Sequence, residues 1–195
     1  QQFLAMNTAS MRGYFSIVPV VFTVLIPALT MRMWAEEKKL KTDEILLTLP
    51  MKDWQIVVGK YLSVLILITG VLALTIPIPL TLSALGDFET GAIIGEYCGS
   101  VLLASTGIAI GLFISSISRN QISAFISSVV VLVFLTLVGN AAVLMQLPQW
   151  LSETINFISL DYHFKSFRKV LIDTRDLAYF VLLTVFFLFL NVKVL

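Results

Sequence analysis

The side chains that most often do chemistry in enzymes are scarce in this sequence. Among its 195 residues are one histidine, His163, and one cysteine, Cys98. A metal site or a serine–histidine pair would have to use His163, which stands among charged residues and is expected to face solvent or the membrane surface. Gly59 and Lys60 do not form a phosphate-binding loop, because the upstream glycine is missing and Tyr61 follows. We expect no catalytic, metal or cofactor site on this chain.

Charged residues are also missing from the middle of the long apolar runs, and Glu96 lies at the edge of one of them. An ionisable group at mid-bilayer is costly and usually marks a proton or ion path. Proton-coupled transport and intramembrane catalysis therefore lack their usual groups. Sodium coupling through backbone carbonyls stays open, because Pro77 and Pro79 could break a helix. If the protein moves a molecule, we expect the energy to arrive from a separate protein.

The composition points to a membrane protein. The sequence is 58% hydrophobic and 13% charged, whereas soluble domains carry about 25% charged residues. This excludes a soluble domain, a disordered tail, a coiled coil and a disulfide scaffold. The net charge of +1 comes without a basic stripe, which excludes a nucleic-acid binder. Membrane lipid is the expected surrounding.

Five stretches without any charge predict the spans. A helix needs about 20 apolar residues to cross a bilayer, and continuous apolar runs favour helices over barrel strands. The fold class is therefore predicted to be all-α, a transmembrane bundle forming a single domain over residues 1–195. Because the count is odd and the chain begins with Gln1, we expect a further helix before it. The stretches are 13–31, 61–86, 97–118, 120–152 and 177–192.

The distribution of basic residues predicts which loops face the cytoplasm. Residues 32–60 hold six Lys or Arg, whereas residues 87–96 hold none and three acids. Short loops rich in Lys and Arg stay inside, so 32–60 is placed inside and 148–176 outside. The outer segment carries four basic residues of its own, which weakens the assignment.

An amphipathic helix is expected in the outer segment, over residues 160–172. Phe164, Phe167 and Leu171 lie at i, i+3 and i+7 on one face, and the basic residues fall on other faces.

A short apolar helix is predicted in the cytoplasmic segment. Thr42 is a plausible N-cap, Asp43 and Glu44 suit the first turn, and Pro50 ends the helix. Its apolar residues are Ile45, Leu46, Leu47 and Leu49. Such a helix has a purpose if it fits a partner's groove; the alternative is a solvated loop whose leucines touch the membrane surface.

Two further pairs of residues predict contacts with other parts of the structure or with a partner. Glu36 and Glu37 precede the short helix and could form ion pairs with basic residues of a partner or of the same segment. Gly107 and Gly111 form a GxxxG pair, which lets another helix approach closely.

Three stretches of the sequence resemble one family. Residues 27–50, which include Glu36, Glu37, Thr42 and Glu44, with 56–61, are similar to the second helix and cytoplasmic segment of ABC-2-type transporter permeases. Residues 114–121 resemble the turn between the fourth and fifth helices, and 161–180 the approach to the sixth. The bacterial subgroup that includes the gliding-motility-associated permease is most similar. One departure is Lys41, where the family usually has glycine.

The resemblance implies a partner and a mechanism. Such permeases have six spans, pair as homo- or heterodimers with a second copy or a paralogue, and sit on ATP-binding cassette ATPase subunits in the bacterial inner membrane. ATP and Mg²⁺ bind on the partner. The resemblance makes Glu36, Glu37 and residues 42–50, with Thr42, Glu44, Leu46, Leu47 and Pro50, the coupling segment that meets the ATPase.

Two readings from different classes follow. The first is the permease subunit of an ATP-driven exporter. The second is a force-transmitting or scaffold membrane subunit of such a complex that moves no cargo. The sequence does not identify a substrate.

Overall fold

The regular secondary structure of the described residues is all helical. The structure, a computed structural model, describes residues 12–42, 51–83, 90–144, 149–167 and 173–194. Five of its helices are long and apolar enough to cross a membrane, which confirms the all-α fold with five predicted spans. They are α1 (Arg12–Leu40), α3 (Asp53–Leu74), α5 (Thr90–Ile117), α6 (Gln121–Leu144) and α9 (Thr174–Val194).

Three short helices lie between these spans: α4 (Pro77–Ser83), α7 (Gln149–Ile158) and α8 (Leu160–Ser166). The break before α4 is where Pro77 and Pro79 predicted it. The amides of Thr75 and Ile76 donate to the carbonyls of Leu72 and Ala73, so the last turn of α3 tightens before the prolines begin a new helix.

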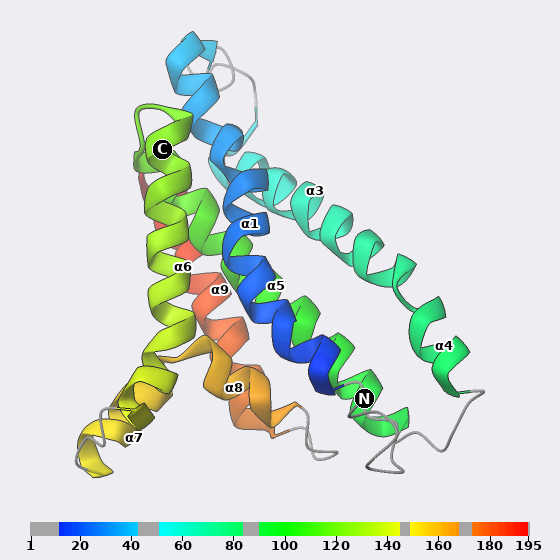
Figure 1. The fold of residues 1–195 in the computed structure, drawn as a ribbon. Helices are drawn as coiled ribbons and strands as arrows, with labels where there is room; N and C mark the ends of the chain where they lie inside the picture. Colours follow the sequence, from blue (N-terminus) through cyan, green and yellow to red (C-terminus); the bar gives the residue numbers. More distant parts are fainter. Residues whose placement is uncertain (1–11, 43–50, 84–89, 145–148, 168–172, 195) are drawn as a thin grey trace.

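Helix α5 is the centre of the bundle. It packs against α1, α9, α6 and α3, and α1 also packs along α6 (Figure 1). In the most apolar part of the membrane span of α5, 67% of the residues are buried inside the bundle, whereas in α9 the share is 17%. The remaining apolar surface of the outer helices is available to lipid, as expected for a bundle whose solvent is a bilayer.

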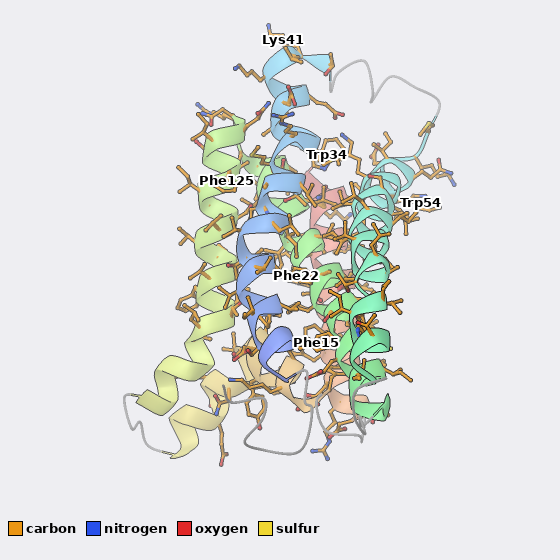
Figure 2. All side chains as sticks on the ribbon, turned by 45° about the vertical axis from the view of Figure 1, so that its right-hand side comes forward. Phe15, Phe22, Trp34, Lys41, Trp54 and Phe125 are labelled. Atoms are coloured by element: carbon orange, nitrogen blue, oxygen red, sulfur yellow. The ribbon has the colours of Figure 1, made fainter. Side chains whose placement is uncertain are left out.

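The bundle has two chemically different ends. At one, which we call the α1–α3 end, α1 and α9 finish and α3 and α6 begin; α4, α7 and α8 lie at the other, the α7–α8 end (Figure 1). Figure 2 shows Lys41 at the α1–α3 end, Trp34 just below it, and Phe15 near the opposite end of α1.

Much of the polar segment 32–60 belongs to these long helices. Helix α1 continues to Leu40 and α3 begins at Asp53. Charged side chains at the end of a span do not interrupt its backbone ladder, because they can extend toward the interface. The connection between the two spans is therefore short.

Two expectations for the outer segment were wrong. The helix predicted over 160–172 ends at Ser166, with Phe167 as its C-cap, and α7 precedes it; Leu171 lies outside the described residues. Phe164 and Phe167 are buried, as their spacing indicated. His163 does not face solvent: it is only 5% exposed, because α7 and α9 supply hydrogen-bond partners to both ring nitrogens.

Candidate functional site

The end of α1 is held in a conformation that few side chains adopt. Lys41 has a φ of 55°, in the left-handed region where glycine has least strain. Its amide donates to the carbonyl of Lys38 at 3.3 Å, and the hydroxyl of Thr42 donates to the carbonyl of Glu37 at 3.3 Å. These bonds satisfy carbonyls that a helix C-terminus leaves free. The chain therefore leaves α1 in a fixed direction, at the position where the resembling family usually has glycine.

Lys60 joins the second turn of α3 to the last turns of α1. Its Nζ lies 2.5 Å from Oε2 of Glu37 and donates to the carbonyl of Met33. The same ammonium lies over the ring of Trp34, 3.9 Å from the centroid, a cation–π contact. The Lys60 side chain is only 13% exposed, so an ion pair and a carbonyl hydrogen bond take the place of most of its hydration.

Helix α5 is hydrogen-bonded to the same part of α1. The hydroxyl of Ser115 accepts hydrogen bonds from the amides of Trp34 and Ala35, both at 3.2 Å, and donates to the carbonyl of Met31 at 3.2 Å. One turn further along α1, Lys38 donates from Nζ to the carbonyl of Ser116. The backbone of α1 is thus bonded directly to the end of α5. We call Trp34, Glu37, Lys38, Lys60 and Ser115 the anchor.

The start of α3 is also fixed. The side-chain carbonyl of Gln55 accepts from the amide of Lys52 at 3.0 Å, while the amide of Gln55 donates to the Lys52 carbonyl at 2.8 Å. Asp53 lies in the first turn, where the helix dipole favours an acid. Both helices that flank the connection therefore have defined ends.

The anchor brings together residues of three spans. Among the described residues, no group of three His, Cys, Asp or Glu could hold a metal ion. What the arrangement does provide is contact between three spans around the point where the chain leaves the bundle. A displacement applied to residues 41–52 would reach α1, α3 and α5 together.

The predicted coupling residues are only partly described. Glu37 pairs with Lys60, one of the two options expected for it, and Glu36 is half-buried on α1. Thr42 contacts α1 as given above. The rest of the predicted coupling helix lies outside the described residues, which concerns Glu44, Leu46, Leu47 and Pro50.

The glycine pair of α5 lies directly against α1. A Cβ added at Gly107 would meet the side chain of Ile26 at 2.8 Å, and one added at Gly111 would meet Oγ1 and Cβ of Thr30. Ile26 and Thr30 are themselves four residues apart, so the two helices touch at matching intervals. Close packing continues from the anchor into the middle of the bundle.

A polar cluster in the middle of three spans was not predicted. The hydroxyl of Tyr61 on α3 lies 2.6 Å from that of Ser105 on α5, which lies 3.2 Å from Oγ1 of Thr184 on α9. Thr106 adds a hydroxyl contact to Thr184 at 3.0 Å. The signal in the sequence was the Ser and Thr content of apolar runs, but their partners are about 80 residues away along the chain.

Apart from Glu37, the residues of the anchor were also not predicted. Lys60 was counted only among the basic residues of the segment 32–60, and Ser115 lay within the stretch 114–121 that resembles a turn between two helices. Only the tertiary fold brings α1, α3 and α5 together at one level.

Comparisons with known proteins gave one match. A family model described as ABC-2 family transporter protein matches residues 1–192, almost the whole chain. Searches of curated proteins and of solved structures found no match.

Proposed function

We propose, from the premise that this chain belongs to the ABC-2 family of transporters, that its anchor transmits the movement of a partner ATPase to the spans. The chain is a membrane subunit of such a transporter, and permeases of this family lack ATPase activity of their own. ABC-2 permeases generally pair with an ATPase subunit. Energy must therefore enter the chain through a contact surface.

We place that surface on the coupling segment, Glu36, Glu37 and residues 42–50, with ATP and Mg²⁺ held by the partner. The observation that carries the proposal is the anchor, which lies where this segment joins α1 and α3. Lys60 bonds α3 to α1, and Ser115 bonds α5 to α1. A push on the segment would therefore act on three spans at once.

The distribution of charge supports a cytoplasmic location for the α1–α3 end. Lys and Arg near span ends are retained on the cytoplasmic side. The basic residues at this end are Arg32, Lys38, Lys39, Lys41, Lys52, Lys60, Arg119 and Lys193.

The proposal has finer parts that rest on the sequence resemblance alone. These are the bacterial inner membrane, export as the direction, and pairing with a second copy or a paralogue. The likeness to the gliding-motility subgroup also keeps a force-transmitting subunit without cargo as the alternative. ATP hydrolysis by the reconstituted complex without any translocated molecule would favour that alternative.

The double substitution Leu46→Asp and Leu47→Asp tests the coupling segment. We expect it to abolish co-purification with the ATPase, because an apolar helix face that enters a groove cannot carry two charges. Insertion into the membrane should be unchanged. Leu40→Asp is the matched control, since Leu40 is 64% exposed but belongs to α1, and it should retain the ATPase. Wild-type recovery of the ATPase with the double variant would refute the proposed contact.

A further inference from the structure

The single histidine of the chain lies between two hydrogen-bond acceptors. Nδ1 of His163 on α8 is 2.5 Å from Oδ1 of Asp176 on α9, and Nε2 is 3.0 Å from the carbonyl oxygen of Phe157 on α7. A neutral imidazole donates from only one nitrogen, whereas the imidazolium donates from both. With an ionised Asp176, only the protonated ring satisfies both contacts.

The surroundings of the ring also favour its charged form. Phe157 lies in the last turn of α7, where the helix dipole attracts a cation. Asp176 lies in the first turn of α9, where the dipole favours a carboxylate. The ring of Tyr179 stacks on the imidazole with centroids 3.9 Å apart and an angle of 18°, an arrangement that a cation strengthens. These contacts oppose the cost of burying the charge.

We propose that His163, Asp176, Tyr179 and the Phe157 carbonyl form a proton-binding site that holds α7 and α8 against α9. With the proton bound, His163 bonds to both neighbouring helices. When the proton leaves, one nitrogen presents a lone pair to an acceptor, so one of the two contacts is lost. Tyr179, whose hydroxyl donates to the Ile158 carbonyl at 2.8 Å, keeps a second link to α7 in either state.

An open surface cavity of about 490 Å³ lies beside the ring, lined by His163, Tyr179, Arg175 and apolar residues of α7 and α9. The charged and titratable neighbours that the structure describes on helices packed against α8 are few. They are Asp173, just before α9; Arg175, Asp176, Tyr179 and Lys193 on α9; Asp161, Tyr162 and Lys165 on α8 itself; Glu153 on α7; and Glu96, Tyr97 and Cys98 on α5. Lys165 pairs with Asp161 at 2.6 Å.

The direction of the effect follows from these contacts. The site is closed when His163 is protonated and Asp176 ionised, and it loosens as rising pH removes the histidine proton. The α7–α8 end should therefore be tighter at acidic pH than at alkaline pH.

A histidine-labelled sample of the full chain in nanodiscs tests this without assignment, since the sequence has one histidine. We expect ¹⁵N NMR to show both ring nitrogens protonated at acidic pH and one proton lost as the pH is raised over the range in which the protein stays folded. Amide exchange of residues 153–166, corrected for its intrinsic pH dependence, should rise with the same midpoint. A ring whose protonation does not change over this range, or a change that exchange does not follow, would overturn the proposal.

Asp176→Asn supplies a second test, because the amide keeps the shape and an acceptor oxygen but not the charge. Exchange of residues 160–166 at acidic pH should rise by about tenfold or more, as expected for losing a hydrogen bond between charged groups, and should no longer vary with pH. Lys165→Gln is the control: it removes an ion pair from the same helix through a side chain that is 47% exposed, and should leave the pH profile unchanged. A pH profile in Asp176→Asn like that of the control would contradict the site.

Discussion

The two ends of the bundle are held together in different ways. At the α1–α3 end, long spans are bonded directly to each other, through Lys60 between α3 and α1 and Ser115 between α5 and α1. At the α7–α8 end, two short helices meet α9 mainly through one histidine, His163, and the aromatic rings around it.

This difference predicts that one end of the bundle resists relative movement of its helices and that the other end opens more easily. Several bonds between the backbones and side chains of long helices resist relative movement, so the anchor can pass a displacement onward. Short helices with few links open at lower free energy than the core of a domain. The comparison indicates a stiffer end and a looser end, and in the proposed function the stiffer end is the one that receives force.

Glycine substitutions on α5 test the difference between the two ends of the bundle, and they are expected to change the free energy of unfolding the most. Gly111→Leu would push Thr30 of α1 away, and we expect a loss of about 1–3 kcal/mol in the free energy of unfolding from overpacking. Gly107→Leu should behave similarly against Ile26. Gly99→Leu meets Phe167 at the end of α8, which can shift more easily, so its loss should be smaller.

Gly70→Leu is the control for this series, because nothing lies within 4 Å of a Cβ at Gly70. It should not lower stability; the higher helix propensity of leucine should raise it by up to about 1 kcal/mol. Denaturant unfolding of the purified variants in detergent gives the ranking. Equal losses for Gly111→Leu and Gly99→Leu would remove the distinction between a stiff and a loose end.

Ser115→Ala measures the hydroxyl of the anchor. It removes the acceptor of the Trp34 and Ala35 amides, and we expect a loss of about 1 kcal/mol in unfolding free energy. Ser63→Ala is matched, because the exposed Ser63 hydroxyl bonds only to the Lys60 carbonyl in its own helix, and should be nearly neutral. Equal effects of the two substitutions would argue against a structural role for Ser115.

Substitution of Lys41 is expected to change the free energy of unfolding the least. The sign of the change shows whether Lys41 is strained. Lys41→Gly relieves left-handed strain of about 1–2 kcal/mol, partly offset by the flexibility of glycine in the unfolded chain, so a small net stabilisation should appear. Lys39→Gly, in the helical part of α1, should instead destabilise by about 1 kcal/mol. The same unfolding assay distinguishes them; destabilisation by both would mean that Lys41 is not strained in solution.

The spans could be predicted from the sequence because the cost of placing charge in lipid acts locally along the chain. The five uncharged stretches therefore mark α1, α3, α5, α6 and α9, and Pro77 marks the end of α3. The burial of His163 could not be predicted in this way. Its partners lie on two other helices, and although Ser159 is a suitable N-cap for the helix predicted from residue 160, no local pattern shows which helices pack around the ring.

The candidate site was predictable only in part. The charges around Glu36 and Glu37 indicated a polar segment between two spans, and the spacing of Gly107 and Gly111 indicated a close helix contact. The bonds of Ser115 to Trp34 and Ala35 join residues 80 and 81 positions apart. Such pairs depend on the register between helices, which the apolar pattern of a span does not encode.

The central claim is that the anchor makes α1 and α3 move as one unit, and distances between spin labels test it most directly. Labels at the exposed positions Val24 on α1 and Ile66 on α3, with Cys98→Ser to remove the native thiol, would be compared in the complex with its ATPase. We predict one narrow distribution that is the same with and without ATP in the wild type. Lys60→Met should broaden it and make it respond to ATP while the ATPase stays bound.

Lys52→Met is the matched control, since Lys52 is an exposed lysine at the start of the same helix, and it should resemble the wild type. If Lys60→Met gave the same narrow, ATP-independent distribution as Lys52→Met, Lys60 would not hold α1 and α3 together, and the account of force transmission through the anchor would be contradicted.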